Sequence, residues 1–179
     1  MSSYPLEHFI ADLEFVLVAA GSEAELLEGA APLVARYATM PGWLEPAHRA
    51  CDEGRPYGEV LLHQAPDGGL NISTGAWSPG GGVPPHDHGT WAIMAGVEGK
   101  ETNTLWRRTE DERLERDEIR PLAPGDVLCM PSDAIHSVVN EGDQVSVTLH
   151  VYGRDLAAGV RHQYDPETGA ASPLGDDFD

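Results

Sequence analysis

The first fifty residues carry apolar side chains at the three-and-four spacing that is typical of buried helix faces. One such stripe runs from Phe9 to Leu17 and a second from Leu26 to Val34. Between them, Ser22 precedes Glu25 by three positions, which is the pattern of a capping box at the start of a helix. The sequence therefore predicts two helices in an N-terminal extension.

From about residue 57 the pattern changes to short apolar or alternating runs, separated by clusters of Gly, Pro, Asn and Asp. The predicted strands cover residues 59–63, 70–77, 91–97, 101–108, 127–130, 136–140 and 145–152. Many short strands at this spacing indicate a β-sandwich or a β-barrel. We therefore expect a mainly β fold.

The length of 179 residues favours a single domain in three parts. Residues 1–50 would form a helical extension packed on the barrel, and residues 51–165 the barrel itself. Residues 166–179 contain Pro, Gly and several acids, and we expect them to be a loosely ordered acidic tail.

Charge and composition exclude several classes of partner. The chain has 30 acidic against 11 basic residues and a formal net charge of -19, which would repel nucleic acid and anionic membranes. No apolar run reaches the length of about 18 to 20 residues that a membrane-spanning helix requires. Two distant cysteines, Cys51 and Cys129, form no CxxC pair, and reduced thiols fit a cytoplasmic location. The expected partners are small molecules.

Two separated stretches carry histidines with the spacing of a metal site. His86 and His88 stand two apart, so in a strand both imidazoles would point to one face. A second block places His136 after Gly125 and Pro131 and before Asn140, in the order G-x5-P-x4-H-x3-N. His136 would then point inward from a neighbouring strand, so His86, His88 and His136 are the candidate metal ligands.

These two blocks together resemble the paired sequence motifs of the cupin superfamily. The resemblance implies a double-stranded β-helix, which is a small barrel of the jelly-roll type. The usual first cupin motif has a glutamate three or four residues after the second histidine, and here those positions hold Ala92 and Ile93. The site would thus consist of three imidazoles, which suit iron, nickel, copper or zinc and leave positions open for substrate.

Within the cupins, the run PPHDHGTWAIMAGVEG and the run Thr148-Leu149-His150-Val151-Tyr152 resemble the thiol dioxygenase family, over roughly residues 57 to 165. This family includes cysteine dioxygenase and 3-mercaptopropionate dioxygenase. The resemblance implies Fe(II) as cofactor, with other divalent metals such as Ni, Zn or Mn possible in purified protein. It also implies a catalytic triad of Thr148, His150 and Tyr152 beside the substrate. Alternation along a strand would place all three on one face, with Thr148 orienting His150 and His150 bonding Tyr152.

Three further positions concern the substrate pocket. Arg161 resembles an arginine that shapes this pocket in the 3-mercaptopropionate branch, and Trp91 is a candidate wall of the pocket, with a core aromatic as the alternative. Where the family holds a substrate carboxylate with Arg or Gln, this chain has Glu59, although a shifted alignment would give that role to His63 or Gln64. Since the sequence has no cysteine near His88, no Cys–Tyr crosslink is expected.

The function predicted from the resemblance is oxidation of a small thiol, such as cysteine or 3-mercaptopropionate, to its sulfinate with O2. Two alternatives remain open at this point. One is a cupin dioxygenase that cleaves a carbon–carbon bond of a diketone or phenolic compound. The other is a metal cupin that binds a small ligand without turnover. The oligomeric state, monomer or homo-oligomer, is not fixed by the sequence.

Overall fold

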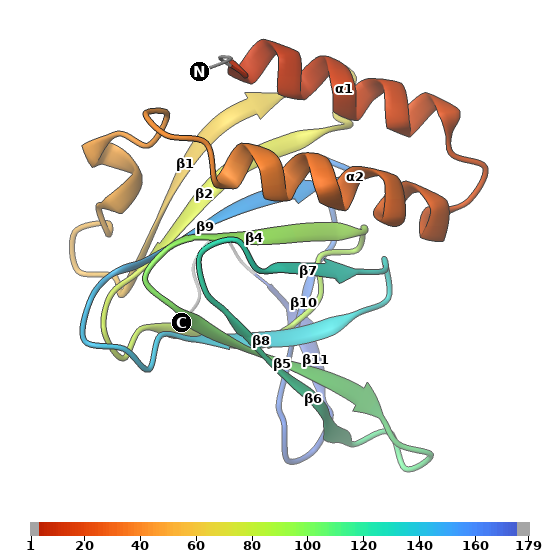
Figure 1. Cartoon of the computed structure of the whole chain (residues 1–179). Helices are drawn as coiled ribbons and strands as arrows, with labels where there is room; N and C mark the ends of the chain where they lie inside the picture. Colours follow the sequence, from red (N-terminus) through yellow and green to blue (C-terminus); the bar gives the residue numbers. More distant parts are fainter. Residues whose placement is uncertain (1–3, 175–179) are drawn as a thin grey trace.

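The structure is a computed structural model that describes residues 4–174 (Figure 1). The N-terminal part forms helix α1 (Leu6–Ala19), helix α2 (Glu23–Ala38) and the short 3-10 helix η1 (Pro46–Arg49). Ser22 caps α2, because its side-chain oxygen accepts a hydrogen bond from the backbone N–H of Glu25 at 3.3 Å. The predicted pair of helices and its capping residue are therefore confirmed.

The remaining residues form two antiparallel sheets. The first has the strand order β1-β2-β9-β4-β7 and the second the order β11-β10-β3-β8-β5-β6. Their bounds are β1 (Tyr57–Gln64), β2 (Asn71–Trp77), β3 (Gly82–His86), β4 (Ala92–Glu98), β5 (Glu101–Arg108), β6 (Leu114–Leu122), β7 (Val127–Met130), β8 (Ile135–Val139), β9 (Ser146–Tyr152), β10 (His162–Tyr164) and β11 (Ala171–Pro173).

The chain moves back and forth between the two sheets as it proceeds. Strands β2, β4, β7 and β9 lie in the first sheet, while β3, β5, β6 and β8 lie in the second. Four-stranded halves in the orders β2-β9-β4-β7 and β3-β8-β5-β6 make the eight-stranded double Greek key of a jelly roll. The predicted fold class, a mainly β jelly roll with an N-terminal helical extension, is confirmed.

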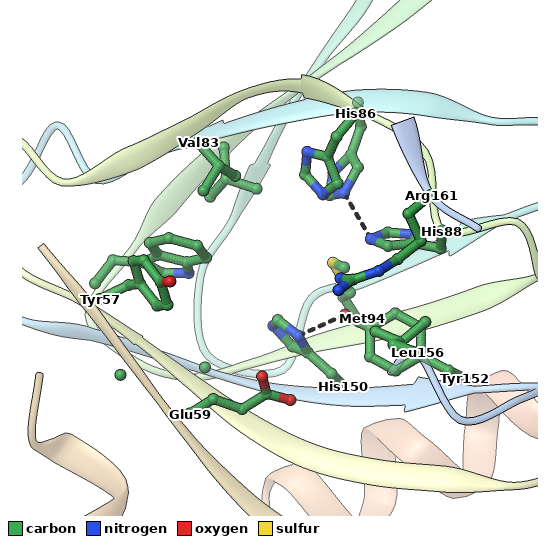
Figure 2. A pocket seen from close by; sticks show the side chains of 15 residues that line it. Tyr57, Glu59, Val83, His86, His88, Met94, His150, Tyr152, Leu156 and Arg161 are labelled. Carbon is green, nitrogen blue, oxygen red and sulfur yellow. Dashed lines mark hydrogen bonds between the residues drawn. The ribbon is translucent and has the colours of Figure 1, made fainter. Parts of the chain in front are cut away.

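Both long helices lie across the outer face of the first sheet (Figure 1). Phe9 of α1 and Val34 of α2 are fully buried there against Ile93 of β4 and Leu149 of β9. Because side chains alternate along a strand, the helices occupy one face of β9 and leave His150 and Tyr152 on the face that lines the barrel cavity (Figure 2), while Thr148 on the same face bonds Glu101 of the second sheet. The helical layer thus fixes which residues of β9 point into the barrel.

Three strands and one boundary differ from the sequence-based expectation. The expected strands omit β3, β6 and β10; most of β6 is exposed and charged, and only Leu114 and Leu122 at its ends are buried. Residues 171–173 form β11, which pairs with β10, whereas the sequence suggested a loose tail from residue 166. The rest of the expected tail, residues 175–179, lies outside the described residues. No helix in residues 4–174 is long and apolar enough to cross a membrane.

Candidate metal centre and cavity

Three histidines from two strands and one loop meet inside the barrel. His86 is the last residue of β3 and pairs across the sheet with His136 of β8, while His88 lies two residues beyond the end of β3. One ring nitrogen from each lies within 4.8 Å of the others, and the Nε2 atoms of His88 and His136 are 3.3 Å apart. The structure therefore brings together the three predicted ligands, although His88 is in a loop and not in a strand.

Hydrogen bonds assign the ring nitrogens of two of these histidines. His86 Nδ1 lies 2.9 Å from the carbonyl oxygen of Pro84, and His136 Nδ1 lies 3.0 Å from Oδ1 of Asn103. Both partners are oxygens that can only accept, so each Nδ1 carries the proton and donates it. The lone pair of each imidazole is then on Nε2, which is the arrangement that a metal ligand needs.

Burial keeps the three imidazoles neutral. All three residues are at most 4% exposed. Loss of hydration lowers the pKa of His86 to about 4 and lowers the pKa values of His88 and His136 well below their ordinary range, and the neighbouring imidazoles lower the latter two further. Three neutral nitrogen donors facing one point form a fitting donor set for a divalent iron, nickel, copper or zinc ion.

The predicted triad of β9 lies beside this cluster, but its hydrogen bonds differ from the expectation. His150 Nδ1 and the Tyr152 hydroxyl are 2.9 Å apart, as expected, and the ring centroids of Tyr152 and His88 are 5.0 Å apart. Thr148 does not orient His150. Its hydroxyl donates instead to the buried carboxylate of Glu101, at 2.5 Å, because Glu101 enters the barrel on β5 directly opposite. Nε2 of His150 has no hydrogen-bond partner among the described residues.

Burial also sets the protonation of the pair His150 and Tyr152. It lowers the pKa of His150 to about 4, with a smaller contribution from His86. It raises the pKa of Tyr152 well above its ordinary value, and the negative charge of Glu59 acts in the same direction. Near neutral pH, the pair therefore consists of a neutral imidazole and a neutral phenol.

A cavity with about 540 Å³ of empty space, including solvent-open space at its mouth, joins these residues (Figure 2). Glu59 and Arg161 both line this cavity, and Figure 2 shows their side chains among its walls. Trp91 does not wall the cavity: it is 8% exposed and belongs to the hydrophobic cluster under the helices. The tryptophan of the cavity is Trp77, at the end of β2.

Gly75 of β2 is a cavity residue that the sequence did not single out. A Cβ atom at this position would lie 2.9 Å from Cε1 of His150 and 3.1 Å from its Nε2. These distances are shorter than ordinary side-chain contacts, so the imidazole occupies the space that any larger residue would need. The glycine lies inside a predicted strand, and an isolated glycine in a strand is a sequence signal for close approach of another group.

Asp87 stands between two ligands and faces away from them. Its Oδ2 lies 3.0 Å from Nδ1 of His162 and also accepts a short hydrogen bond from the hydroxyl of Tyr164, both on β10. The Asp87 carboxylate also accepts from the backbone N–H of His162 at 3.1 Å. These bonds anchor the loop that carries His88 to the second sheet.

Comparison with known proteins gives distant likenesses. No family model matches the chain. Among solved structures, an oxalate oxidase in complex with glycolate is 15% identical over 63% of this chain and 59% of its own, with a TM-score of 0.49. The protein TT1209 from Thermus thermophilus is 20% identical over 62% of this chain and 95% of its own, with a TM-score of 0.49. A cupin superfamily protein from Desulfitobacterium hafniense is 19% identical over 65% and 94%, with a TM-score of 0.48. This chain spans less than two thirds of the oxalate oxidase.

Proposed function

We propose that this chain is an iron-dependent dioxygenase that oxidises a small thiol to its sulfinate. The observation that supports this most directly is the position of Tyr152. Its neutral phenol lies in the same cavity as three neutral imidazoles, with its ring centroid 5.0 Å from that of His88. A polar donor buried beside a three-histidine cluster is more than a binding site for a small ligand requires.

The proposed reaction converts RSH and O2 into RSO2H, which loses its proton at neutral pH. Both oxygen atoms end on sulfur, so sulfur loses four electrons and O2 gains them, and no other reductant is needed. A bound iron ion would supply the redox-active centre, held by Nε2 of His86 and His136 and by His88. The remaining tasks fall to the chain: the barrel walls shield the buried imidazoles from most bulk water, and Tyr152 offers a hydrogen bond to the reacting atoms.

His150 has a supporting part in this proposal. Its ring bonds the Tyr152 hydroxyl at 2.9 Å and packs against the backbone of Gly75. Since burial keeps the imidazole neutral, it can hold the phenol in place without adding a positive charge beside the bound cation.

The charges of the cavity limit the substrate. Glu59 supplies a negative charge and Arg161 a positive one, and neither side chain forms an ion pair with another described residue within 4.0 Å. A carboxylate next to Glu59 would be repelled at short range, whereas an ammonium group would be attracted. We therefore propose a thiol with a free amine, such as cysteine, ahead of one with a carboxylate alone, such as 3-mercaptopropionate.

Oxygen uptake by iron-loaded protein tests the proposal. The panel should contain cysteine, cysteamine and 3-mercaptopropionate, with mass spectrometry to identify the sulfinate. His136→Ala is the matched control, because it removes one imidazole ligand and should abolish metal retention and turnover together. A protein that retains iron but consumes no oxygen with any of these thiols would contradict the thiol oxidation. Cleavage of a diketone or phenolic compound would then indicate the carbon–carbon dioxygenase.

A further inference from the structure

A buried chain of polar side chains connects the ligand His136 to the opposite sheet. Nδ1 of His136 donates to Oδ1 of Asn103 at 3.0 Å, and Nδ2 of Asn103 donates to Oε1 of Glu101 at 3.0 Å. The second oxygen of Glu101, Oε2, accepts from the hydroxyl of Thr148 at 2.5 Å. All four residues are at most 1% exposed.

We propose that Glu101 is a positioning residue for the metal centre: acting through Asn103, it fixes the orientation and the tautomer of His136. In this proposal Thr148 serves the ligand His136 and not the pair of His150 and Tyr152. The inference concerns metal binding and does not depend on which substrate the proposed enzyme oxidises.

The direction of the hydrogen bonds carries the argument. Burial raises the pKa of Glu101, but the hydrogen bonds from Thr148 and Asn103 act against this and favour the ionised carboxylate. An ionised carboxylate accepts hydrogen bonds and cannot donate them, so Asn103 turns its NH2 group toward Glu101. Oδ1 of Asn103 is then the atom that faces His136, and it can only accept. Nδ1 of His136 must therefore carry the proton, which leaves Nε2 bare at 3.3 Å from Nε2 of His88.

Glu101 lies near the three-histidine cluster but is not one of its candidate ligands. Its oxygens are not part of the group of ligand atoms that lie within 4.8 Å of one another, which contains only His86, His88 and His136 among the described residues. A carboxylate with so little exposure costs several kcal/mol of desolvation unless it is hydrogen-bonded. Here both oxygens have partners. Outer partners of this kind orient ligating imidazoles and increase their basicity.

Metal affinity of purified variants tests the proposal without using activity. The apoprotein is titrated with Co(II) against a competing chelator, and the melting temperature is recorded in parallel. Glu101→Gln removes the charge and allows the side-chain amide to turn either way, so the dissociation constant should rise about 10- to 100-fold, as is usual for such outer partners. Asn103→Leu, which removes the acceptor of His136, should weaken binding at least as much.

A double variant separates the positioning role from general damage. In Glu101→Gln with Asn103→Asp, an aspartate accepts directly from His136, and the glutamine can donate to that aspartate and accept from Thr148. The double variant retains the direction of the hydrogen bonds from His136 and Thr148 and keeps a single buried charge. Its metal affinity should therefore return to within about threefold of wild type. Unspecific loss of packing would instead leave the double variant binding metal at least as weakly as Glu101→Gln.

Two further controls keep the test decisive if Glu101→Gln fails to fold. Thr148→Val should weaken metal binding, while Thr148→Ser, which keeps the hydroxyl, should not. Ser137 follows His136 on β8, and Ser137→Ala removes the 2.9 Å hydrogen bond that its hydroxyl accepts from Trp106 Nε1 of β5, so this variant should leave metal affinity unchanged. Nitrogen-15 spectra of the apoprotein should show a proton on Nδ1 of His136, with a mixture of tautomers in the Glu101→Gln or Thr148→Val variant.

The proposal is overturned if Glu101→Gln, or Thr148→Val in its place, binds Co(II) within twofold of wild type. It is also overturned if Thr148→Val lowers only turnover while the metal affinity stays the same, because Thr148 would then act on His150. Since no thiol is present in the titration, failure of the proposed oxidation would leave this result interpretable.

Discussion

Acidification of the metal-free protein should destabilise it through the buried histidines of the cavity. His150 has a pKa of about 4 in the folded protein, against an ordinary value of 6.5. Between these two values the unfolded chain binds a proton that the folded protein does not. The contribution of His150 to stability is therefore fully present above about pH 6.5 and is lost as the pH falls toward about 4.

The size of the effect follows from the same two values. Each pH unit inside the interval costs about 1.4 kcal/mol, so a change from about pH 7 to about pH 4.5 should remove about 2 kcal/mol through His150 alone. The pKa of His86 is lowered to the same value by burial, and those of His88 and His136 are lowered as well. Their contributions have the same sign, so the apoprotein should lose several kcal/mol of its free energy of unfolding.

Urea unfolding of the apoprotein at both pH values measures this loss, and His150→Gln isolates one residue. The difference between wild type and this variant should change by about 2 kcal/mol between the two pH values. His8→Asn is the matched control, because it removes an exposed imidazole of α1 and leaves the cavity intact. An equal change in the free energy of unfolding between the two pH values, in wild type and in His150→Gln, would refute the inference that burial keeps His150 neutral.

Three substitutions test individual residues of the cavity. Tyr152→Phe removes the phenol but no ligand, so iron content should stay near wild type while turnover falls by about 10-fold or more; full activity in oxygen uptake would contradict the assigned role. Glu59→Gln should raise KM for cysteamine by about 5-fold or more and lower it for 3-mercaptopropionate, and equal changes for both thiols would show that Glu59 does not read substrate charge. Gly75→Ala places a Cβ 2.9 Å from the His150 ring, so turnover should fall while Co(II) affinity is retained, and an unchanged rate would show that the imidazole has room to move.

The fold was predictable because burial and alternation leave a clear trace in this sequence. Every residue of strand β9 is buried. Its apolar residues Val147, Leu149 and Val151 alternate with Ser146, Thr148, His150 and Tyr152, and the structure buries the two sets on opposite faces. Strand β6 was missed for a related reason. Seven of its residues are exposed, so no buried face marks it, and it is defined by pairing with β5, which local sequence does not show.

The cluster of three histidines was readable from motif spacing, but the hydrogen bonds around it were not. Thr148 and His150 share a face of β9, which made a bond between them a reasonable prediction. The Thr148 hydroxyl donates instead to Glu101 on β5, a strand that pairs with β6 and β8 and not with β9. For Trp91 the sequence left a pocket wall and a core aromatic open, and the structure places it in the core, because its position beside β4 did not show which face it would occupy.

The outcomes for Thr148 and Trp91 have a common physical origin, which also affects the three-histidine cluster. A strand fixes the face on which a side chain lies, but its partner comes from the opposite sheet, and in a jelly roll that sheet is built from other parts of the chain. Glu101 can satisfy Thr148 and Asn103 at once only because the two sheets meet at this depth of the barrel. The same contact that takes Thr148 away from His150 therefore connects its hydroxyl, through Glu101 and Asn103, to His136 of the three-histidine cluster, so the Thr-His-Tyr sequence pattern is divided between two hydrogen-bond groups in this structure.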